Sequence, residues 1–286
     1  MFYRLLRSSR LPPPWRLRHL STTATQEAPR FKFKTETGRL LDIVTNSLYS
    51  DRSVFLRELL ANAADANTRA VQLLTKTGDA GGLANPRKIK IKTDLEHRRL
   101  AIEDDGVGMS RDELAENLGT IAHSGSRMAA AEGSTEARII GQFGVGFYSA
   151  LMVGRRVRVY SRRVDAPEGT PVWCWSVSRP ADGAPIDEYT LSEAVDEVPC
   201  GFTGTRVVID LADGAVEYAE AGRIADAIRQ HTHRLPYAIE LDGEAIDAAG
   251  KERRPVWLQD LPSVQDWRAA YEELSGGDRE PPLAYI

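Results

Sequence analysis

The 286-residue chain contains only two cysteines, Cys174 and Cys200, which lie 26 positions apart. That spacing does not match the paired cysteines of zinc sites, and two cysteines cannot hold together a disulfide-rich fold. We therefore assign no role to either thiol. Long hydrophobic runs are also absent, since none approaches the roughly 18 residues of a membrane span. We expect no membrane partner and a soluble processed protein.

Lysine is absent from residues 1–30, and Glu27 is the one acid there. The segment holds six arginines and the hydroxyl-rich stretch 21–25. This composition is typical of a disordered mitochondrial transit peptide, and a disordered basic arm is the alternative. We expect a transit peptide over residues 1–30 and a mature protein in the mitochondrial matrix.

Excess positive charge is missing from the rest of the chain. Residues 1–30 carry +5, so a whole-chain charge of −4 leaves −9 for the remainder. An acidic remainder argues against a nucleic-acid partner, because phosphate backbones are bound by clustered Lys and Arg. Any anion site must therefore be local. The hydrophobic fraction of 42% is sufficient for a substantial core.

A polar stripe marks the segment that follows Asp51. Glu58, Asn62 and Asp65 are spaced i, i+4 and i+7 in a run that otherwise consists largely of Leu, Ala, Val and Phe. This spacing puts the three side chains on one face of a helix. The stripe is either a solvated face or a face that binds a ligand.

Two glycine-rich motifs follow, Asp-Asp-Gly-Val-Gly-Met at 104–109 and Gly-Gln-Phe-Gly-Val-Gly at 141–146. Taken alone, the first predicts a turn after a strand, and the second is compatible with a tight bend between a strand and a helix. Their order after the polar helix favours a different interpretation. A carboxylate, an amide and two flexible backbone loops would converge on one nucleotide.

The pattern predicts an α+β fold, a two-layer sandwich in which helices cover one face of a mostly antiparallel sheet. Period-2 alternation predicts the strands and 3.6 periodicity the helices. We expect strands at 31–34, 89–92, 99–102, 157–160, 172–176, 205–210 and 237–241, and helices at 38–48, from 52 past 65, at 112–118, 147–153 and 219–234.

The polar stretch between the helix at 112–118 and residue 140 is either a disordered insertion or a movable lid, and we favour the lid. A hinge is expected near Pro236. The first unit would then comprise residues 31–235, and residues 236–286 would be the truncated start of a second unit.

Four motifs together resemble the amino-terminal ATPase domain of the heat shock protein 90 family, and specifically its mitochondrial branch, that of the tumour necrosis factor receptor associated protein. They are LDIVTNSLYS at 41–50, FLRELLANAADA at 55–66, NLGTIAHSGS at 117–126 and IIGQFGVGFYSA at 139–150. The resemblance implies the fold shared with the ATPase component of DNA gyrase, histidine kinases and a mismatch-repair ATPase, which binds ATP without a Walker A loop. No Walker A motif occurs in this chain.

The resemblance also implies individual roles. Glu58 would orient or deprotonate the attacking water, and Asn62 would bind the Mg²⁺ that bridges the phosphates. Asp104 would accept the adenine amino group, Met109 would pack against the ring, and Thr205 would support Asp104. The remaining ATP-binding positions are Asp65, Asn117 near the ribose, Arg127 in the lid, Gln142, and the main-chain amides of Gly144, Val145, Gly146 and Phe147. Helix N-terminal amides suit phosphate, whereas a carboxylate suits the base.

Two positions depart from the family pattern. Asp105 replaces the usual threonine and adds a carboxylate near the base pocket, which could raise one pKa and weaken adenine binding. Asn67 replaces a leucine and must find a partner or face water. The family's middle-domain arginine and its dimerisation domain are not in residues 1–286, so we expect slow hydrolysis and a homodimer only in a full-length form.

The sequence therefore predicts an ATP-dependent chaperone domain that assists client proteins in mitochondria, with ATP and Mg²⁺ as cofactors. The alternative is a non-catalytic nucleotide-binding fragment that regulates the full-length chaperone. A histidine kinase is disfavoured because no helical pair with a phosphoacceptor histidine precedes residue 31. His97 and His123 are interpreted as ordinary surface or loop residues.

Overall fold

The computed structural model describes residues 28–33, 51–84, 86–119, 146–180, 184–194, 197–199, 201–231 and 235–246. The predicted helix at 38–48 lies outside these ranges. So do residues 1–27 of the expected transit peptide, residues 120–140 of the expected lid, and the chain beyond residue 246.

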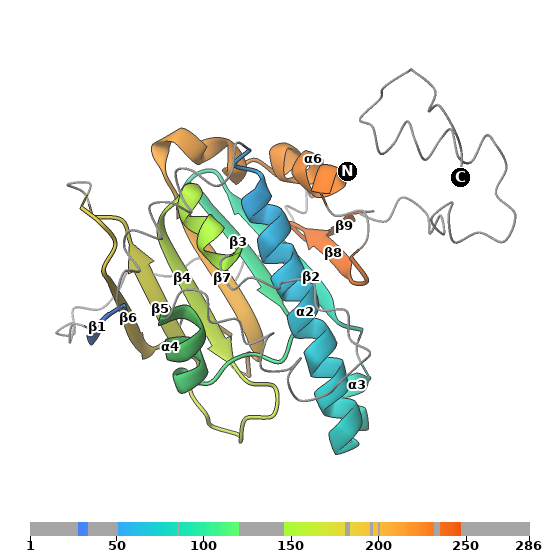
Figure 1. Ribbon diagram of the computed structural model, residues 1–286. Coiled ribbons are helices and arrows are strands. Elements are labelled where there is room, and N and C mark those ends of the chain that lie inside the picture. Colours follow the sequence, from blue (N-terminus) through green and yellow to red (C-terminus); the bar gives the residue numbers. More distant parts are fainter. Residues whose placement is uncertain are drawn as a thin grey trace, which may run out of the picture. The chain divides into compact units, whose positions relative to one another are not determined.

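One sheet of nine strands is the framework of the described residues (Figure 1). The strands are β1 (Arg30–Lys32), β2 (Lys88–Asp94), β3 (Arg99–Asp104), β4 (Gly154–Arg162), β5 (Trp173–Ser178), β6 (Glu188–Glu193), β7 (Gly204–Leu211), β8 (Ala238–Leu241) and β9 (Glu244–Ile246). Across the sheet their order is β1-β6-β5-β4-β7-β3-β2-β8-β9. Only the β2–β8 pair is parallel among these neighbours.

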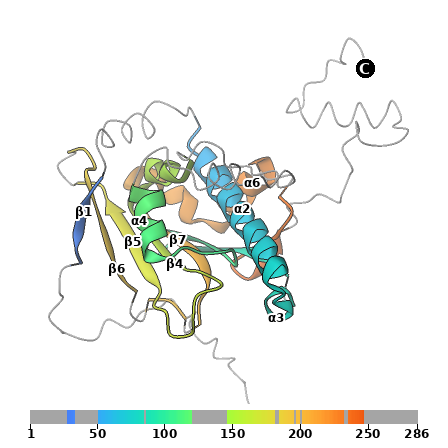
Figure 2. The same ribbon diagram turned by 60° about the horizontal axis from the view of Figure 1, so that its bottom comes forward.

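The helices lie on one face of this sheet, as Figures 1 and 2 show from two directions. They are α2 (Val54–Thr77), α3 (Ala80–Leu83), α4 (Arg111–Gly119), α6 (Ala221–His231) and the 3₁₀ helices η1 (Gly146–Met152) and η2 (Asp213–Ala219). Helix α2 packs on β2, β3 and η1, and α4 packs on β5 and β6. The predicted α+β architecture is confirmed.

Helix α2 forms because its apolar residues recur on one side. Its fully buried side chains include Phe55, Leu56, Leu60 and Ala70, and burial of each large one contributes about 1.5–3 kcal/mol. The helix ends at Gly78, whose φ of 70° is left-handed. The N–H of Asp79 then donates to the carbonyl of Leu74 at 3.0 Å, which completes a Schellman ending.

Several predicted elements differ in detail. The helix expected at 147–153 is the 3₁₀ helix η1. The helix expected at 219–234 is the shorter α6, and η2 precedes it. Strand β6 was not predicted, although it joins the edge strand β1 to β5. Strand β8 pairs with β2, so the strand expected to open a new unit belongs to the first one. The boundary expected at 235/236 therefore moves beyond residue 246.

Asn67 lies on the buried side of α2 and is completely inaccessible to solvent. Its Nδ2 donates to the Lys88 carbonyl at a long 3.4 Å, and its Oδ1 has no hydrogen-bond partner. The Asn67 amide group therefore forms one long hydrogen bond through its nitrogen, and its oxygen forms none. A buried polar atom without a partner costs about 1–3 kcal/mol.

Substitution Asn67→Leu is therefore expected to stabilise the nucleotide-free chain by about 2 kcal/mol. The new side chain has a similar branched shape, removes the unpaired carbonyl oxygen and raises helix propensity by a few tenths of a kcal/mol. Urea unfolding followed by circular dichroism measures the change. Gln72→Leu, at an exposed position of the same helix, is the control and should change stability by less than about 0.5 kcal/mol. Equal or lower stability of Asn67→Leu would contradict the cost assigned to the amide.

Candidate functional site

Asp104 is a carboxylate at the end of β3, on the face that the helices cover. Only 7% of the residue is exposed. Its Oδ1 accepts the N–H of Gly106 at 2.9 Å, and the backbone N–H of Thr205 also donates to its carboxyl group. Burial raises the pKa of Asp104 to about 7, which these two hydrogen bonds oppose and the nearby Asp105 and Glu103 reinforce. The group is thus a buried acceptor that titrates near neutral pH.

The turn after Asp104 is packed tightly on α2. The N–H of Val107 donates to the carbonyl of Ala66 at 3.0 Å. A β-carbon at position 106 would lie 2.5 Å from the Ala66 Cβ and 2.5 Å from the Asp104 Oδ1, so only glycine fits there. This close approach brings the predicted carboxylate of β3 next to the polar helix α2.

Met109 and Asn117 lie together at the other side of this turn. Met109 is partly buried against the core, and Asn117 Nδ2 is 3.8 Å from its Sδ. Helix α4, which carries Asn117, begins with a capping box in which the N–H groups of Ser110 and Glu113 each bond the other residue's side chain. The predicted base and ribose residues are thereby held on one rigid segment.

Glu58 lies at the opposite end of the polar stripe, against the start of η1. A β-carbon at Gly146 would be 2.6 Å from Glu58 Oε2, so this carboxylate touches the glycine itself. Arg57 Nη2 contacts Glu58 Oε1 at 2.8 Å, with 24% of the Glu58 side chain exposed. One turn further along α2, Asn62 is exposed, whereas Asp65 is buried.

Phe147 packs its ring edge-on against Trp175 and Tyr148, with centroid distances of 5.6 and 5.5 Å. These edge-to-face contacts hold Phe147 at the start of η1, where Gly146 touches Glu58. The other residues expected at the phosphates, Arg127, Gln142, Gly144 and Val145, lie outside the described residues.

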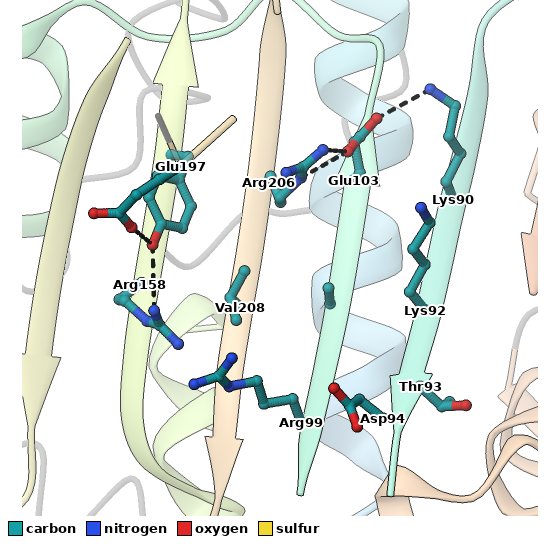
Figure 3. Close-up of a pocket in the computed structure, with 12 residues that line it drawn as sticks. Lys90, Lys92, Thr93, Asp94, Arg99, Glu103, Arg158, Glu197, Arg206 and Val208 are labelled. Atoms are coloured by element: carbon teal, nitrogen blue, oxygen red, sulfur yellow. Dashed lines mark hydrogen bonds and ion pairs between the residues drawn. The ribbon is translucent and has the colours of Figure 1, made fainter. Parts of the chain in front are cut away.

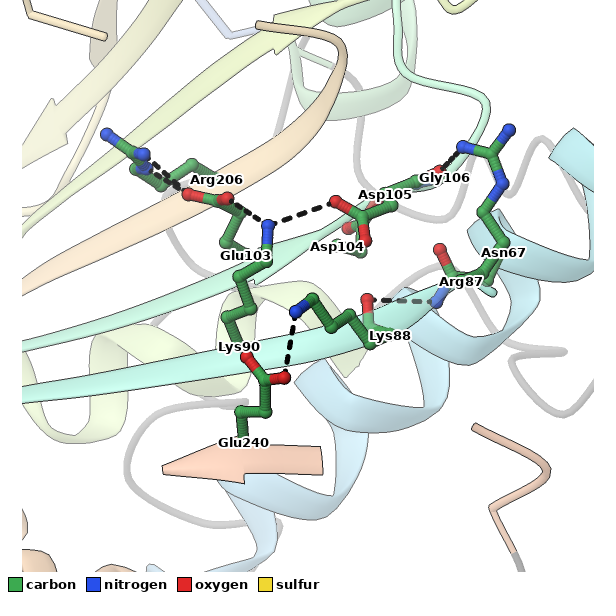
Figure 4. A network of polar contacts seen from close by, with 10 residues as sticks. All are labelled: Asn67, Arg87, Lys88, Lys90, Glu103, Asp104, Asp105, Gly106, Arg206 and Glu240. Carbon is green, nitrogen blue, oxygen red and sulfur yellow. Dashed lines mark hydrogen bonds and ion pairs between the residues drawn. The ribbon is translucent and has the colours of Figure 1, made fainter. Parts of the chain in front are cut away.

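Asp105 points away from the candidate site. Its carboxylate pairs with Lys90 at 3.2 Å on the sheet face that no described helix covers (Figure 4). Lys90 also pairs with Glu103 at 3.0 Å. Burial alone would raise the pKa of Glu103, but Arg206 and Lys90 outweigh burial and lower it. The extra acid is therefore neutralised locally, and its effect on Asp104 is smaller than the effect of burial.

A pocket opens on the same uncovered face, over Ala101 and Val208 (Figure 3). Its cations are largely paired with acids: Arg206 with Glu103, and both Arg99 and Arg158 with Asp210. Neighbouring residues of a strand point to opposite faces, so Glu103 in this pocket and Asp104 in the candidate site are separated by the sheet. The pocket is not part of the candidate site.

Ser161 was missed by sequence reasoning. It is inaccessible to solvent, and its Oγ accepts the N–H of Met109 at 2.8 Å. The available signal was its position, because Val157 and Val159 alternate inward on β4 and the next inward position is a polar residue. A hydroxyl on the buried side of a strand needs partners, and these partners belong to the site.

The candidate site thus has two ends. The buried acceptor Asp104 lies at one end with Met109, Thr205 and Asn117, and Glu58 lies at the other end beside the start of η1. A family model described as histidine kinase-, DNA gyrase B-, and HSP90-like ATPase matches residues 38–200. The chain belongs to this ATPase family.

The chain is also similar to longer curated proteins. It is 39% identical over 276 residues to "Chaperone protein HtpG" of Gluconobacter oxydans, which covers 92% of this chain and 42% of that protein. The corresponding protein of Methylorubrum extorquens is 39% identical over 269 residues, 90% of this chain and 41% of that protein. "Heat shock protein 75 kDa, mitochondrial" of Bos taurus is 39% identical over 241 residues, 83% and 32% of the two chains. The chain spans about two fifths of the bacterial relatives' length.

None of the helices in the described ranges has the length and apolar character required to cross a membrane.

Proposed function

We propose that this chain is the ATP-binding and slowly hydrolysing domain of an ATP-dependent chaperone that assists protein folding. The observation that carries the proposal is the buried Asp104 carboxylate, which accepts two backbone N–H groups and lies directly opposite Thr205. Met109 is joined to the same strands through Ser161. A buried carboxylate in that setting is an acceptor for an exocyclic amine and would repel phosphate. Chaperone relatives, bacterial and mitochondrial, support the broader role.

In this proposal the base lies on Met109 with its amino group at Asp104, and Asn117 approaches the ribose. The triphosphate extends toward η1, where the main-chain amides of Gly146 and Phe147 supply donors. Asp65, Arg127, Gln142, Gly144 and Val145 complete the proposed ATP-binding set. The contact between Glu58 and Gly146 supports a role for Glu58 in orienting or deprotonating a water at the γ-phosphate.

Mg²⁺ fits the residues present. The Asn62 side chain is exposed on α2, one turn from Glu58, and makes no hydrogen bond within the described part of the chain. A hard amide oxygen with nucleotide phosphates and water is a common donor set for Mg²⁺, which seldom takes more than one or two protein ligands. Bound there, the ion would neutralise phosphate charge, and Asn62 would hold it.

The finer assignments belong to the same proposal. We place the mature protein in the mitochondrial matrix, with a transit peptide that ends before β1, because Arg30 pairs with Thr190 in the sheet, and a middle domain beginning after residue 246. Its partners would be ATP or ADP and client proteins. Homodimerisation would require a full-length form, and neither nucleic acid nor a membrane is a proposed partner.

One observation favours a second candidate, a non-catalytic nucleotide-binding fragment that regulates the full-length chaperone. Arg57 is paired with Glu58 at 2.8 Å. A guanidinium paired with this carboxylate occupies one of its oxygens and competes with a water for it.

Isothermal titration of the 286-residue chain with ADP and ATP, with and without Mg²⁺, tests the proposed site. We expect one nucleotide per chain, bound more tightly with Mg²⁺ because the ion screens the phosphates next to Glu58. Titration with uridine diphosphate is the control, since it keeps the phosphates and lacks the 6-amino purine. Absence of ADP binding, or equal affinity for the two diphosphates, would contradict an adenine site at Asp104.

A further inference from the structure

Three polar side chains form a row across the helix-covered face of the sheet. Asp104 of β3 is directly opposite Thr205 of β7, and Thr205 is directly opposite Ser161 of β4. All three are buried, at 7%, 9% and 0% exposure. Directly opposite side chains on neighbouring strands are in contact distance, so the row acts as one unit.

Ser161 Oγ is the centre of the hydrogen bonds in this row. It contacts the backbone N of Met109 at 2.8 Å, the carbonyl of Gly204 at 2.9 Å and Thr205 Oγ1 at 3.0 Å. A serine hydroxyl has one proton and two acceptor positions. The N–H of Met109 can only donate, and the carbonyl of Gly204 can only accept. The Ser161 proton therefore points to Gly204.

The direction of the third bond follows from the first two. With its proton committed to Gly204, Ser161 Oγ can only accept from Thr205, so the Thr205 hydroxyl donates to Ser161. Thr205 Oγ1 then has lone pairs but no proton for any other partner. Beside it, the Asp104 carboxylate also offers acceptor atoms. Above pH 7, where Asp104 is ionised, the polar side chains at this end of the site are thus both acceptors.

We propose that Ser161 is a positioning residue that sets the base specificity of the nucleotide site, because it fixes Thr205 as an acceptor. This inference rests on the proposed function. An acceptor pair favours a 6-amino purine, which donates, and disfavours a 6-oxo purine, whose carbonyl oxygen would face two acceptors. Two hydrogen-bond acceptors that face each other with no proton between them cost binding free energy. Nucleotide sites with buried acceptors of this kind discriminate strongly between amino and oxo analogues.

Ser161 also has a structural role, which the test must separate from specificity. It holds the Met109 N–H, and the neighbouring N–H of Val164 donates to the carbonyl of Val107 at 2.9 Å. Both contacts fix the turn at 105–110 on the end of β4. Loosening that turn would weaken binding of every purine nucleotide alike. Loss of the hydroxyl constraint would instead change the ratio between amino and oxo purines.

The experiment compares dissociation constants of ADP and inosine diphosphate, which differ at the 6 position, by titration of the full chain. In Ser161→Ala, the Thr205 hydroxyl is free to turn its proton toward a 6-oxo group. We expect the preference for ADP to fall by about tenfold relative to wild type. Ser161→Thr keeps the hydroxyl and should retain the wild-type preference. Ser176→Ala is the control, because it removes a buried serine of β5 that accepts a hydrogen bond from Arg156. It should leave the ratio of the two dissociation constants unchanged.

A second pair of variants changes Thr205 and leaves Ser161 in place. Thr205→Val removes the hydroxyl and should reduce the preference, whereas Thr205→Ser should keep it. In the Thr205→Val background, Ser161→Ala should produce no further change in the ratio. An unchanged ratio in Ser161→Ala or Thr205→Val, or equal effects of Ser161→Ala in both backgrounds, would overturn the inference. Failure of the wild-type chain to bind ADP would instead overturn the proposed function.

Discussion

Replacement of Asp104 by asparagine is expected to weaken ADP binding by about a hundredfold. The carboxylate is the buried acceptor at the base end of the site, and it already accepts the N–H groups of Gly106 and Thr205. An asparagine amide has one acceptor oxygen, and its NH₂ would face those donors or the adenine amino group. Titration calorimetry at pH 8, where the wild-type carboxylate is ionised, measures the loss.

Asp105→Asn is the matched control, because the neighbouring carboxylate points to Lys90 on the opposite face. It should leave ADP affinity equal or slightly higher, since Asp105 contributes to the raised pKa of Asp104. Similar losses in the two variants would remove Asp104 from base recognition.

The same Asp104→Asn variant has a second readout in the pH dependence of stability. Burial raises the pKa of Asp104 from 3.8 to about 7. Between these values the folded chain keeps a proton that the unfolded chain has lost. The stability contributed by the protonated carboxyl is complete below pH 3.8 and is lost as pH rises toward 7. Wild type should therefore lose stability relative to Asp104→Asn by up to about 1.4 kcal/mol per pH unit across that interval.

Glu58→Gln should abolish most ATP hydrolysis and leave nucleotide affinity within a few-fold of wild type. The carboxylate touches Gly146, at the end where the phosphates are proposed to lie. Loss of a group that activates water costs about a hundredfold or more in rate. Phosphate release under single-turnover conditions, with protein in excess over ATP, measures the slow reaction directly.

Glu116→Gln, at an exposed position of α4, makes the same change in charge and should hydrolyse ATP at the wild-type rate. Arg57→Gln frees Glu58 from its ion pair and should raise the rate if that pair restrains the carboxylate. Equal turnover by wild type and Glu58→Gln would exclude Glu58 as the water-activating group. Absence of turnover in wild type, Arg57→Gln and Glu58→Gln alike would select the non-catalytic alternative.

The parts of the fold that depend on local periodicity were predictable. Helix α2 was identified by its apolar spacing, and β2 and β3 were identified by their alternation. Each of these patterns can be recognised from the residues of that element alone. Asp104 was placed at a strand end by the glycines that follow it. These features are fixed by neighbours within a few residues.

The parts that depend on long-range register were not predictable. Ser161 reaches the site because β4 pairs with β7 and β7 with β3, although these strands are separated by up to about a hundred positions. No local sequence pattern predicts the register in which these three strands pair. The partner of Asn67 could not be predicted for the same reason, because the acceptor that it reaches is a carbonyl of β2. The 3₁₀ geometry of η1 was also missed, because its short apolar run satisfies α and 3₁₀ periodicities equally.

The parallel pairing of β8 with β2 has a practical consequence for anyone preparing shorter fragments. Residues 88–91 of β2 align with residues 238–241 of β8, and the short strand β9 is the last strand on that side. A fragment that stops at residue 235 would leave the main-chain donors and acceptors of β2 open to solvent. An exposed edge strand can pair with other copies of the same chain, and the fragment then precipitates. Recombinant fragments should therefore retain at least residue 246.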